Sequence, residues 1–463
     1  MNFVNAVINQ SARTENGMLA RQSTANANVD LFFAIGASRG KDIVPQFVSA
    51  LVENREWALR IAQWARDVRG GAGERQIFRD IVAYLEVNDI EGARALMAKI
   101  PEIGRWDDLF AFNVLRGEAF ALIAQALKSG NGLCAKWMPR QGSDAVALRN
   151  FLGFSPKRYR KTLVTLTKVV EQQMCAGEWS NINFEHVPSL ASARYKKAFS
   201  RNAPEQFGAY VEKLTSGEAK VNASAVYPYD VLKGVEADVY NSNELNHVVA
   251  QWNALPNYVG DASVLPLVDV SGSMSCPVGG NKSLTCMDVA VSLGLYLADK
   301  NQGAFKDVFL TFSADPELLH LQGNVVQKMH QMKRSDWGMN TDLVKAIKKI
   351  LQTAVEGRVP QADMPRILLV LSDMQFDADR MLDMSAYEVI GREYQNAGYE
   401  MPAVVFWNLN ANDNVPVRFD QSGVAMVSGF SPVIMKAVLG ANLDSLSPVK
   451  IMLDAVMVQR YDI

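Results

Sequence analysis

Oxygen-bearing side chains gather in three short strings of the C-terminal half. In the first string Asp269, Ser271 and Ser273 alternate, so one loop offers a carboxylate and two hydroxyls. Thr341 and Asp373 offer a further hydroxyl and a further carboxylate from two later strings. Hard oxygen donors of this kind suit Mg²⁺, Mn²⁺ or Ca²⁺. We therefore predict that these residues bind one divalent cation, with Mg²⁺ favoured.

Each string also has a purely structural interpretation. The loop at Asp269 could be a capped turn before a helix, Thr341 could be the N-cap of the next helix, and Asp373 could end a strand in a turn. The context favours the metal site, because Asp269 directly follows the apolar run Val264–Val268 and Asp373 follows Ile367–Leu371 within two residues. Both carboxylates are thus predicted at strand ends.

Apolar runs of strand length recur through the C-terminal half. Val308–Phe312 and Pro402–Trp407 continue the series. Continuous apolar runs suit parallel strands that are covered on both faces, and ligands of such sheets bind at the carboxyl ends of the strands. We predict a doubly wound, Rossmann-like α/β domain over residues 260–463. The helices predicted between its strands are Met287–Asp299, Asp342–Ala354 and Tyr387–Ala397.

The residues before the α/β domain have a different spacing of apolar side chains. From about Val44 to Ala250 apolar residues recur at helical spacing, with short polar or glycine-containing breaks. Serial helices of this kind predict an all-helical, solenoid-like domain over residues 31–255. Residues 1–30 are polar and form a predicted N-terminal arm, either flexible or folded back on another domain. The predicted helices are Val44–Ala65, Ile77–Leu85, Ile90–Ile100, Leu109–Leu127, Ala145–Leu152, Pro156–Cys175 and Pro204–Ser216.

Cations are concentrated in part of the helical half. Gly130 to Arg201 holds twelve basic and four acidic residues, in a chain of net charge −2. Trp137, Tyr159, Trp179 and Tyr195 are interleaved with these cations, and cations with planar rings suit single-stranded RNA. The rings could instead be core anchors of amphipathic helices and the cations their solvated face.

Four arginines (Arg66, Arg69, Arg75 and Arg79) surround a glycine-rich elbow at residues 70–73. The elbow is either a helix–helix corner or a phosphate-binding loop. The residues predicted to contact RNA are Arg66, Arg69, Arg75, Lys136, Arg140, Lys157, Arg158, Arg160, Lys161, Lys196 and Lys197.

Several strings resemble known families. Asp67–Arg75 and Pro101–Leu109 resemble the TROVE module of Ro autoantigen-type proteins. The chain is more closely similar to an uncharacterised family in which a TROVE-like helical half precedes a von Willebrand factor A-type (vWA) half. The likeness extends from about Leu31 to Asp454. The other strings that carry it are Ala135–Pro139, Pro156–Leu163, Trp337–Asp342, Ser372–Asp377, Val405–Leu409 and Val427–Ser431.

The resemblance has implications for fold and function. It implies a ring of HEAT-like helical repeats closed by the vWA domain, in a ribonucleoprotein scaffold that binds small or misfolded RNA on a basic surface. The predicted cation ligands match the metal-ion-dependent adhesion site of vWA domains. In that site an open coordination position accepts a carboxylate from a partner protein.

The sequence contains no recognisable catalytic motif. His320 and His330 stand in no recognisable catalytic string, and Cys276 has no basic neighbour in sequence, so an unreactive thiol is expected. The scattered cysteines, and the lack of a signal-peptide pattern or a membrane-length apolar run, predict a cytoplasmic protein. We therefore expect a non-enzymatic scaffold that binds RNA. The alternative is a protein-binding or assembly module whose vWA metal captures an acidic residue of a partner protein.

Overall fold

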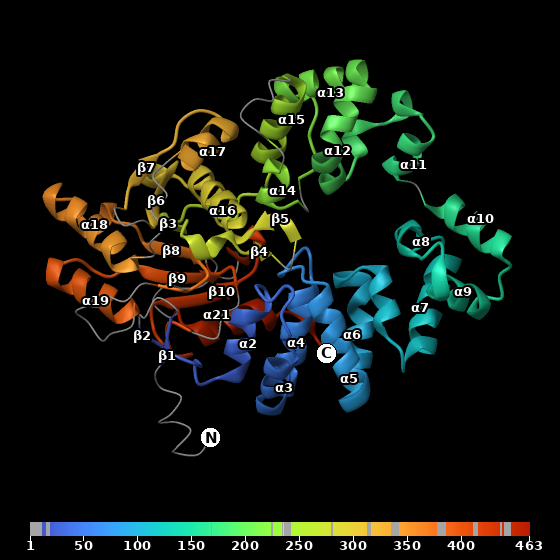
Figure 1. Cartoon of the computed structure of the whole chain (residues 1–463), viewed down its shortest axis with the longest axis horizontal. Coiled ribbons are helices and arrows are strands. Elements are labelled where there is room, and N and C mark those ends of the chain that lie inside the picture. The colour runs from blue at the N-terminus through green and yellow to red at the C-terminus, as the bar shows by residue number, and fades with distance from the viewer. Residues whose placement is uncertain are drawn as a thin grey trace.

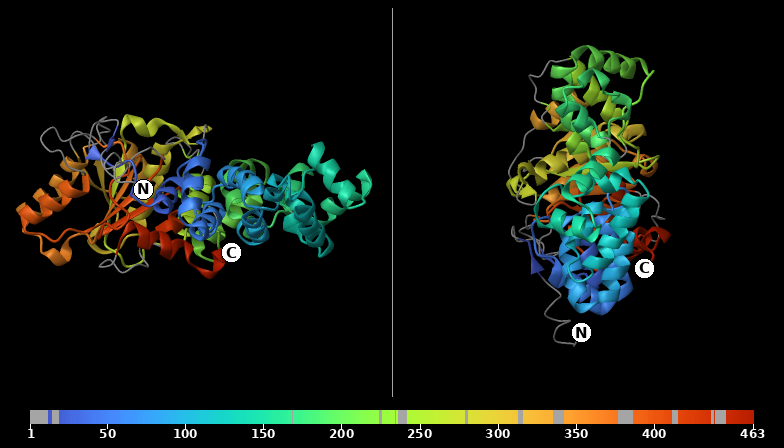
Figure 2. Two further views of the ribbon diagram at one scale, coloured as in Figure 1. Left: turned by 90° about the horizontal axis from the view of Figure 1, so that it is seen from below. Right: turned by 90° about the vertical axis from the view of Figure 1, so that its right-hand side faces the viewer.

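The chain forms an α/β domain and an arc of helices whose two ends both contact that domain (Figure 1). Seen from below, the arc extends away from the sheet and makes the molecule elongated (Figure 2). The computed structural model describes residues 12–14, 19–167, 169–223, 226–233, 235, 242–278, 281–312, 316–334, 342–376, 386–410, 415–435, 438 and 446–463.

The predicted all-helical half is confirmed. Its helices lead from the sheet out to α10 and return through α12 to α15 (Figure 1). No helix among the described residues is long and apolar enough to cross a membrane. The helices are α2 (Ala27–Ile35), α3 (Val44–Glu53), α4 (Arg55–Arg66), α5 (Gln76–Asn88), α6 (Ile90–Ile103), η1 (Trp106–Ala111), α7 (Arg116–Lys128), α8 (Gly132–Trp137), α9 (Gly142–Phe151), α10 (Pro156–Leu166), α11 (Val170–Cys175), η2 (Trp179–Asn181), η3 (Phe184–His186), α12 (Ser189–Asn202), α13 (Pro204–Ser216), α14 (Pro228–Leu232) and α15 (Ser242–Asn253).

Three of the predicted long helices are in fact broken. The expected helix over residues 44–65 divides into α3 and α4 at Asn54, whose side chain accepts a hydrogen bond from the Trp57 amide and caps α4. A side chain that satisfies an amide at a helix start favours a new helix over a continuous one. The stretch over residues 156–175 divides into α10 and α11, and the stretch over 109–127 into η1 and α7.

The α/β domain contains a six-stranded sheet in the order β10-β9-β8-β3-β6-β7. All neighbours are parallel except the short edge strand β7, which is antiparallel to β6. The predicted doubly wound class is thus confirmed, and β7 and β10 are additions to the predicted strands. The strands are β3 (Val264–Asp269), β6 (Val308–Phe312), β7 (Leu318–His320), β8 (Ile367–Ser372), β9 (Ala403–Asn408) and β10 (Val424–Ser428).

Helices cover both faces of the sheet. Val264 and Val268 of β3 pack in the same apolar cluster as α16 (Cys286–Lys300). Leu265 and Leu267 point to the other face and share a cluster with α18 (Leu343–Glu356) and α19 (Ala386–Ala397). Alternation of side chains along a strand explains why a fully buried strand needs apolar residues at every position. The remaining elements are α17 (Val325–Arg334), α21 (Pro448–Val456), η4 (Gly272–Ser275), η5 (Gly303–Phe305), η6 (Gln361–Asp363), η7 (Pro432–Ile434) and η9 (Gln459–Tyr461).

The described part of the N-terminal arm is folded back on the α/β domain. Its strands β1 (Ala12–Arg13) and β2 (Leu19–Ala20) pair with each other, and Arg21 forms a backbone bridge with Val415. Helix α2 begins at Ala27, so the predicted arm boundary at residue 30 falls inside a helix. The α2 segment then contacts β10, where the Gly36 amide donates to Ser428 Oγ at 3.0 Å.

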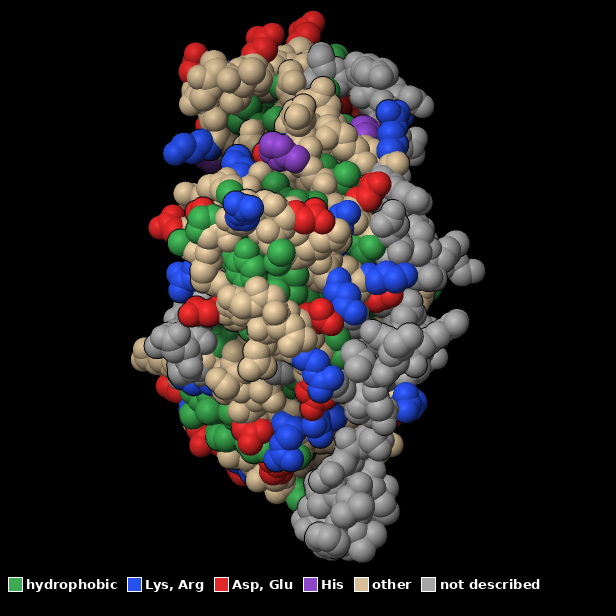
Figure 3. All heavy atoms as spheres, turned by 90° about the vertical axis from the view of Figure 1, so that its left-hand side faces the viewer, with side chains coloured by type: hydrophobic (Ala, Val, Ile, Leu, Met, Phe, Trp, Pro, Cys, Tyr) green, Lys and Arg blue, Asp and Glu red, His purple; other side chains and the backbone are tan. Residues whose placement is uncertain are grey.

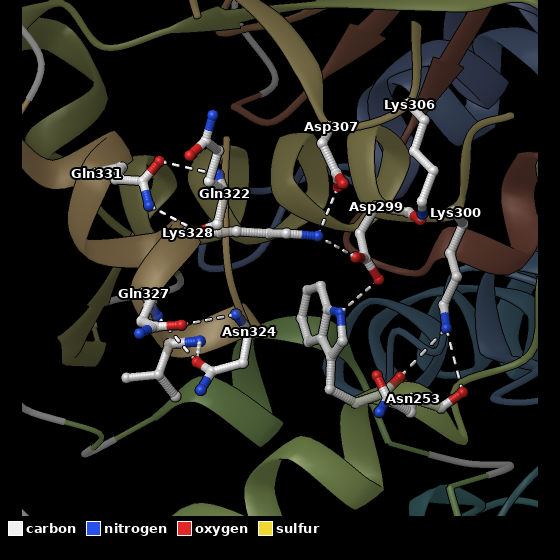
Figure 4. Close-up of polar contacts among 12 residues, drawn as sticks. Asn253, Asp299, Lys300, Lys306, Asp307, Gln322, Asn324, Gln327, Lys328 and Gln331 are labelled. Atoms are coloured by element: carbon white, nitrogen blue, oxygen red, sulfur yellow. Dashed lines mark hydrogen bonds and ion pairs between the residues drawn. The ribbon is translucent and has the colours of Figure 1, made fainter. Parts of the chain in front are cut away.

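A largely buried ion network of the α/β domain receives a hydrogen bond from the far end of the arc (Figure 4). Lys328 of α17 lies 2.7 Å from Asp299 of α16 and 2.6 Å from Asp307. Trp252 of α15 donates its indole N–H to Asp299 Oδ2 at 2.9 Å. Burial opposes the charge of Asp299, yet its hydrogen bonds with Lys328 and Trp252 lower its pKa below the usual value.

A second network holds the near end of the arc. Asp67, which follows α4, is fully buried and accepts hydrogen bonds from Arg460 and from the Tyr461 hydroxyl at 3.0 Å. Burial again opposes ionisation, but the Arg460 contact lowers the pKa of Asp67. Charged residues of the α/β half therefore pair with both ends of the arc.

Replacing Lys328 should destabilise the protein far more than replacing a surface lysine. Lys328→Met leaves two carboxylates without their cation in a half-buried site, and we expect a loss of about 3 kcal/mol in the free energy of unfolding. Lys345→Met, on the exposed side of α18, should cost under about 0.5 kcal/mol. Urea denaturation measures both, and equal losses would show that the buried network contributes no more than a surface pair.

Candidate metal centre and basic surface

Asp269 is the last residue of the central strand β3 and is completely buried. Its two carboxylate oxygens have separate donors: the Ser271 amide donates to Oδ1 at 2.9 Å, and Ser372 Oγ donates to Oδ2 at 2.5 Å. The carboxylate orientation is therefore fixed from both sides, and each oxygen retains a lone pair for a further ligand.

The loop after Asp269 brings two hydroxyls together. Ser271 is buried and Ser273, in η4, is exposed, and their Oγ atoms are 3.0 Å apart. The loop thus presents an inner and an outer hydroxyl on the same side. A cation bound by these oxygens would be reachable from solvent at Ser273.

Asp373 reaches the same edge because β8 is parallel to β3. The register pairs Val268 with Leu371, which places Asp373 just beyond the end of β8, beside Asp269. Asp373 is 2 % exposed, and its charge together with burial raises the pKa of Asp269 to about 6, burial having the larger effect. Two carboxylates at such a buried edge repel each other unless a cation lies between them.

These residues fit a divalent cation. The donors are two carboxylates and two hydroxyls, all hard oxygen ligands. Burial and the charge of Asp373 raise the pKa of Asp269, and a cation bound here would favour the ionised form. Asp269, Ser271, Ser273 and Asp373 would hold the ion, which would supply positive charge and an open coordination position. The fifth predicted ligand, Thr341, lies outside the described residues.

Two cysteines lie at the same edge. Cys276 follows η4, Cys286 begins α16, and their sulfur atoms are 3.2 Å apart. The Cys286 thiol, and to a smaller extent Lys41, lower the pKa of Cys276 to about 7 against the opposing effects of burial and Asp373. The residues that affect the pKa of Cys276 are neighbours in space and not in sequence, so the sequence did not indicate them. The expectation of an unreactive thiol stays a prediction.

The strongest group of accessible cations lies on α10. Lys157, Arg158, Arg160 and Lys161 are all exposed, while Tyr159 and Leu163 anchor the helix in the core. None of these four cations forms an ion pair with a carboxylate in the described part of the chain. Their positive charge is therefore not neutralised locally.

Other predicted contacts are accessible but partly engaged. Arg75 lies 3.9 Å from Asp107, Arg69 is bonded weakly to the Glu102 carbonyl, and Arg140 donates to Thr167. Lys136 lies over the Trp137 ring, and Lys197 is exposed on α12. By comparison, the outer face of the α/β domain mixes cations and carboxylates closely (Figure 3).

Two predicted RNA contacts are corrected by their burial. Arg66 is 2 % exposed, and its guanidinium lies 2.7 Å from the Asp108 carboxylate, inside the helical corner. Lys196 is 5 % exposed and donates to the carbonyls of Ala193 and Lys233, and burial lowers its pKa to about 8. Neither side chain can reach a phosphate on the surface.

The interleaved aromatic residues act as anchors. Tyr159 is buried and donates its hydroxyl to the Pro139 carbonyl at 2.9 Å. Trp179 and Tyr195 pack against the apolar cluster around Phe199, and Trp137 is covered by Arg105 at 3.8 Å. These contacts favour the interpretation that the aromatic rings anchor the helices in the core over the interpretation that they stack on RNA bases.

A serine and a histidine meet inside the arc, which the sequence did not indicate. Ser192 Oγ lies 2.7 Å from His247 Nε2, and both residues are buried. Burial, with a smaller effect of Lys196, lowers the pKa of His247 to about 3. An imidazole of such low basicity is a poor general base at neutral pH.

Comparisons with known proteins match both halves of the chain. Residues 263–453 match a domain of unknown function (DUF7788), and residues 120–265 match a second domain of unknown function (DUF2828). These adjacent matches agree with the predicted likeness to an uncharacterised two-part family.

Two further proteins are similar over most of their length. The "Uncharacterized protein L728" of Acanthamoeba polyphaga mimivirus is 27 % identical over 507 residues, which cover 95 % of this chain and 86 % of that protein. The crystal structure of Deinococcus radiodurans RO (RSR) protein is 14 % identical with a TM-score of 0.41, and the match covers 93 % of this chain and 99 % of that one.

Sequence reasoning missed two features of the metal edge. Ser372 orients Asp269, and its signal was its place directly before Asp373 at a strand end. The proximity of Cys276 and Cys286 was signalled by Gly279 and Gly280 between them, because such a pair is typical of a hairpin turn.

Asp269→Asn tests the cation site directly. The substitution removes a buried charge whose pKa is raised, so without metal we expect the variant to be more stable than the native protein at pH 7.5, by about 1 to 3 kcal/mol. The native protein should gain thermal stability with Mg²⁺, and the variant should not.

Calorimetric titration with Mg²⁺ and thermal unfolding provide the measurements. Asp363→Asn, at an exposed carboxylate of the same domain, is the matched control and should keep the full response to Mg²⁺. Equal Mg²⁺ binding by the native protein and Asp269→Asn would contradict the site.

Proposed function

We propose that this protein is a non-enzymatic scaffold that binds RNA on the helical arc and carries a divalent cation on its α/β domain. The observation that carries the proposal is the group of exposed, unneutralised cations on α10. The predicted likeness to TROVE/vWA chains suggested the same class of ligand.

The pairing of other cations makes α10 distinctive. Arg55 lies 2.7 Å from Asp89 and Arg94 lies 3.0 Å from Glu118, so the first helices of the arc neutralise much of their own charge. Helix α10 instead exposes four cations within five residues. A polyanion that contacts them releases counterions, which supplies sequence-independent affinity.

The position of α10 also supports the proposal. Helix α10 lies at the part of the arc furthest from α18 and α19 (Figure 1). A ligand as large as a folded RNA can approach this surface without contacting the outer helices of the α/β domain. The cations therefore serve as the first point of contact, and shape rather than base sequence would dominate recognition.

The α10 cations can be tested by a quadruple substitution. In Lys157→Gln/Arg158→Gln/Arg160→Gln/Lys161→Gln we expect binding of a structured RNA to weaken by at least about tenfold at moderate salt. The slope of log K against log [salt] should fall by about 3, at roughly 0.7 for each lost phosphate contact. Mobility shift at a series of salt concentrations gives both values.

The matched control removes the same charge from the α/β domain. Arg334→Gln/Lys345→Gln/Lys348→Gln/Lys349→Gln changes cations of α17 and α18 and should leave RNA binding within about twofold, because this region holds carboxylates close to its cations. If both variants lose affinity equally, the effect is one of net charge. If the native protein binds no RNA, the proposal fails.

A second candidate function is favoured by the outer hydroxyl of the metal loop. Ser273 is exposed next to the buried carboxylates, so a bound cation could accept an acidic side chain from a partner protein. The protein would then act as an assembly module. Here the cation is the point of contact, and α10 is not required.

Removal of the cation separates the two candidates. For an assembly module, Asp269→Ala and treatment with EDTA should each abolish recovery of protein partners from the native host, while RNA recovery is unchanged. For an RNA scaffold, the α10 variant loses RNA and Asp269→Ala retains it. Partners that persist after both metal treatments would argue against docking through the cation.

A further inference from the structure

A short hairpin connects the candidate metal loop to the first helix of the α/β domain. Its strands β4 (Pro277–Val278) and β5 (Asn281–Thr285) are antiparallel, and Pro277 lies opposite Thr285. The next pair outward is Cys276 with Cys286, whose amide donates to the Cys276 carbonyl at 3.1 Å. The two cysteines are therefore cross-strand partners at the base of the hairpin.

The geometry already suits a bond between the two sulfurs. They lie 3.2 Å apart, so their side chains point toward each other. Directly opposed residues of an antiparallel pair have Cα atoms about 4.5 to 5.5 Å apart. A disulfide accepts Cα separations of about 4.4 to 6.8 Å. A bond therefore requires small rotations of the side chains and no change of the backbone.

The two thiols differ in their exposure to solvent. Cys276 is partly exposed, whereas Cys286 is 2 % exposed, with Sγ 3.3 Å from the Leu409 carbonyl. An oxidant in solution thus reaches Cys276 first and finds Cys286 directly behind it. Cys134 is buried elsewhere, and Cys175 is exposed at the end of α11, so neither competes for Cys276 within the described arrangement.

We propose that Cys276 and Cys286 form a reversible disulfide when a hydroperoxide oxidises Cys276. In the first step the Cys276 sulfur attacks the peroxide oxygen, the O–O bond breaks, and the products are a sulfenic acid and water or an alcohol. In the second step the Cys286 sulfur attacks the sulfenic sulfur, the S–S bond forms, and the sulfenic oxygen leaves as water with the thiol proton. A dithiol reductant returns both thiols by exchange.

The crosslink has a defined structural effect. Cys276 follows η4, which contains Ser273, and Cys286 is the first residue of α16, which packs against β3. The disulfide would therefore tie the loop after Asp269 to the start of a core helix. This modification does not depend on RNA binding, and it can be detected whether or not the loop holds a cation.

The test uses the full chain carrying Cys134→Ser and Cys175→Ser, so that the two cysteines under study are the only thiols. The protein is treated with a small excess of hydrogen peroxide, alkylated, and digested with trypsin without reduction. Cleavage after Lys282 separates the cysteines, so a disulfide joins residues 234–282 to residues 283–300. We expect this joined species after peroxide, and its loss after treatment with dithiothreitol.

Single substitutions identify the order of attack. With Cys286→Ser, Cys276 should react with a sulfenic acid probe and form no crosslink. With Cys276→Ser, Cys286 should remain an alkylatable thiol under the same conditions. The proposal is overturned if both cysteines of the parent chain stay alkylatable, or if Cys276 proceeds to sulfinic acid while Cys286 stays free. The parent chain alone decides this, so misfolding of a single variant cannot hide the answer.

Discussion

The α/β domain contacts both ends of the helical arc through buried polar networks, by an ion pair at one end and by an indole hydrogen bond at the other. Asp67 binds Arg460 and Tyr461 at one end, and Lys328 lies between Asp299 and Asp307 at the other. Charges in such places are costly unless paired, so buried Asp67 is tolerated only when it reaches Arg460. The ions of the Lys328 network all belong to the α/β domain, and Trp252 of the arc adds a hydrogen bond to Asp299. The curvature of the arc, and hence the position of α10, depends on this closure.

The same parallel sheet decides what gathers at the candidate metal edge. Because β3 and β8 run in one direction, Asp269 and Asp373 end at the same edge although they are 104 positions apart in the chain. Ser372 then orients Asp269 from the neighbouring strand. The Asp269 carboxylate is held by two hydrogen bonds, whereas Ser273 is exposed, so a cation bound here would meet preorganised ligands in an open site.

The sequence predicted the elements whose signal is local. Strands β3, β6, β8 and β9 were expected within about one residue of their observed bounds, since a buried parallel strand must be apolar throughout. Strand β10 was missed, because a short apolar run between glycines is also typical of a buried turn or helix segment.

Features that depend on tertiary contacts were less predictable. The position of Asp269 beside Asp373 followed from strand order, but the burial of Arg66 and Lys196 did not follow from their charge. A lysine or arginine is expected at the surface when only the sequence is known. The interior positions are explained by the partners of these side chains, which are the Asp108 carboxylate for Arg66 and main-chain carbonyls for Lys196. For the same reason the proximity of Cys276 to Lys41 could not be inferred.

The contact between Asp67 and Arg460 also has a consequence for synthesis on the ribosome. Asp67 is made 393 residues before Arg460, which at about 5 to 20 residues per second is a delay of roughly 20 to 80 seconds. During that time the carboxylate must stay hydrated, so the corner after α4 cannot close as it does in the finished protein. The newly made arc would therefore stay open until the last residues of the α/β domain are made.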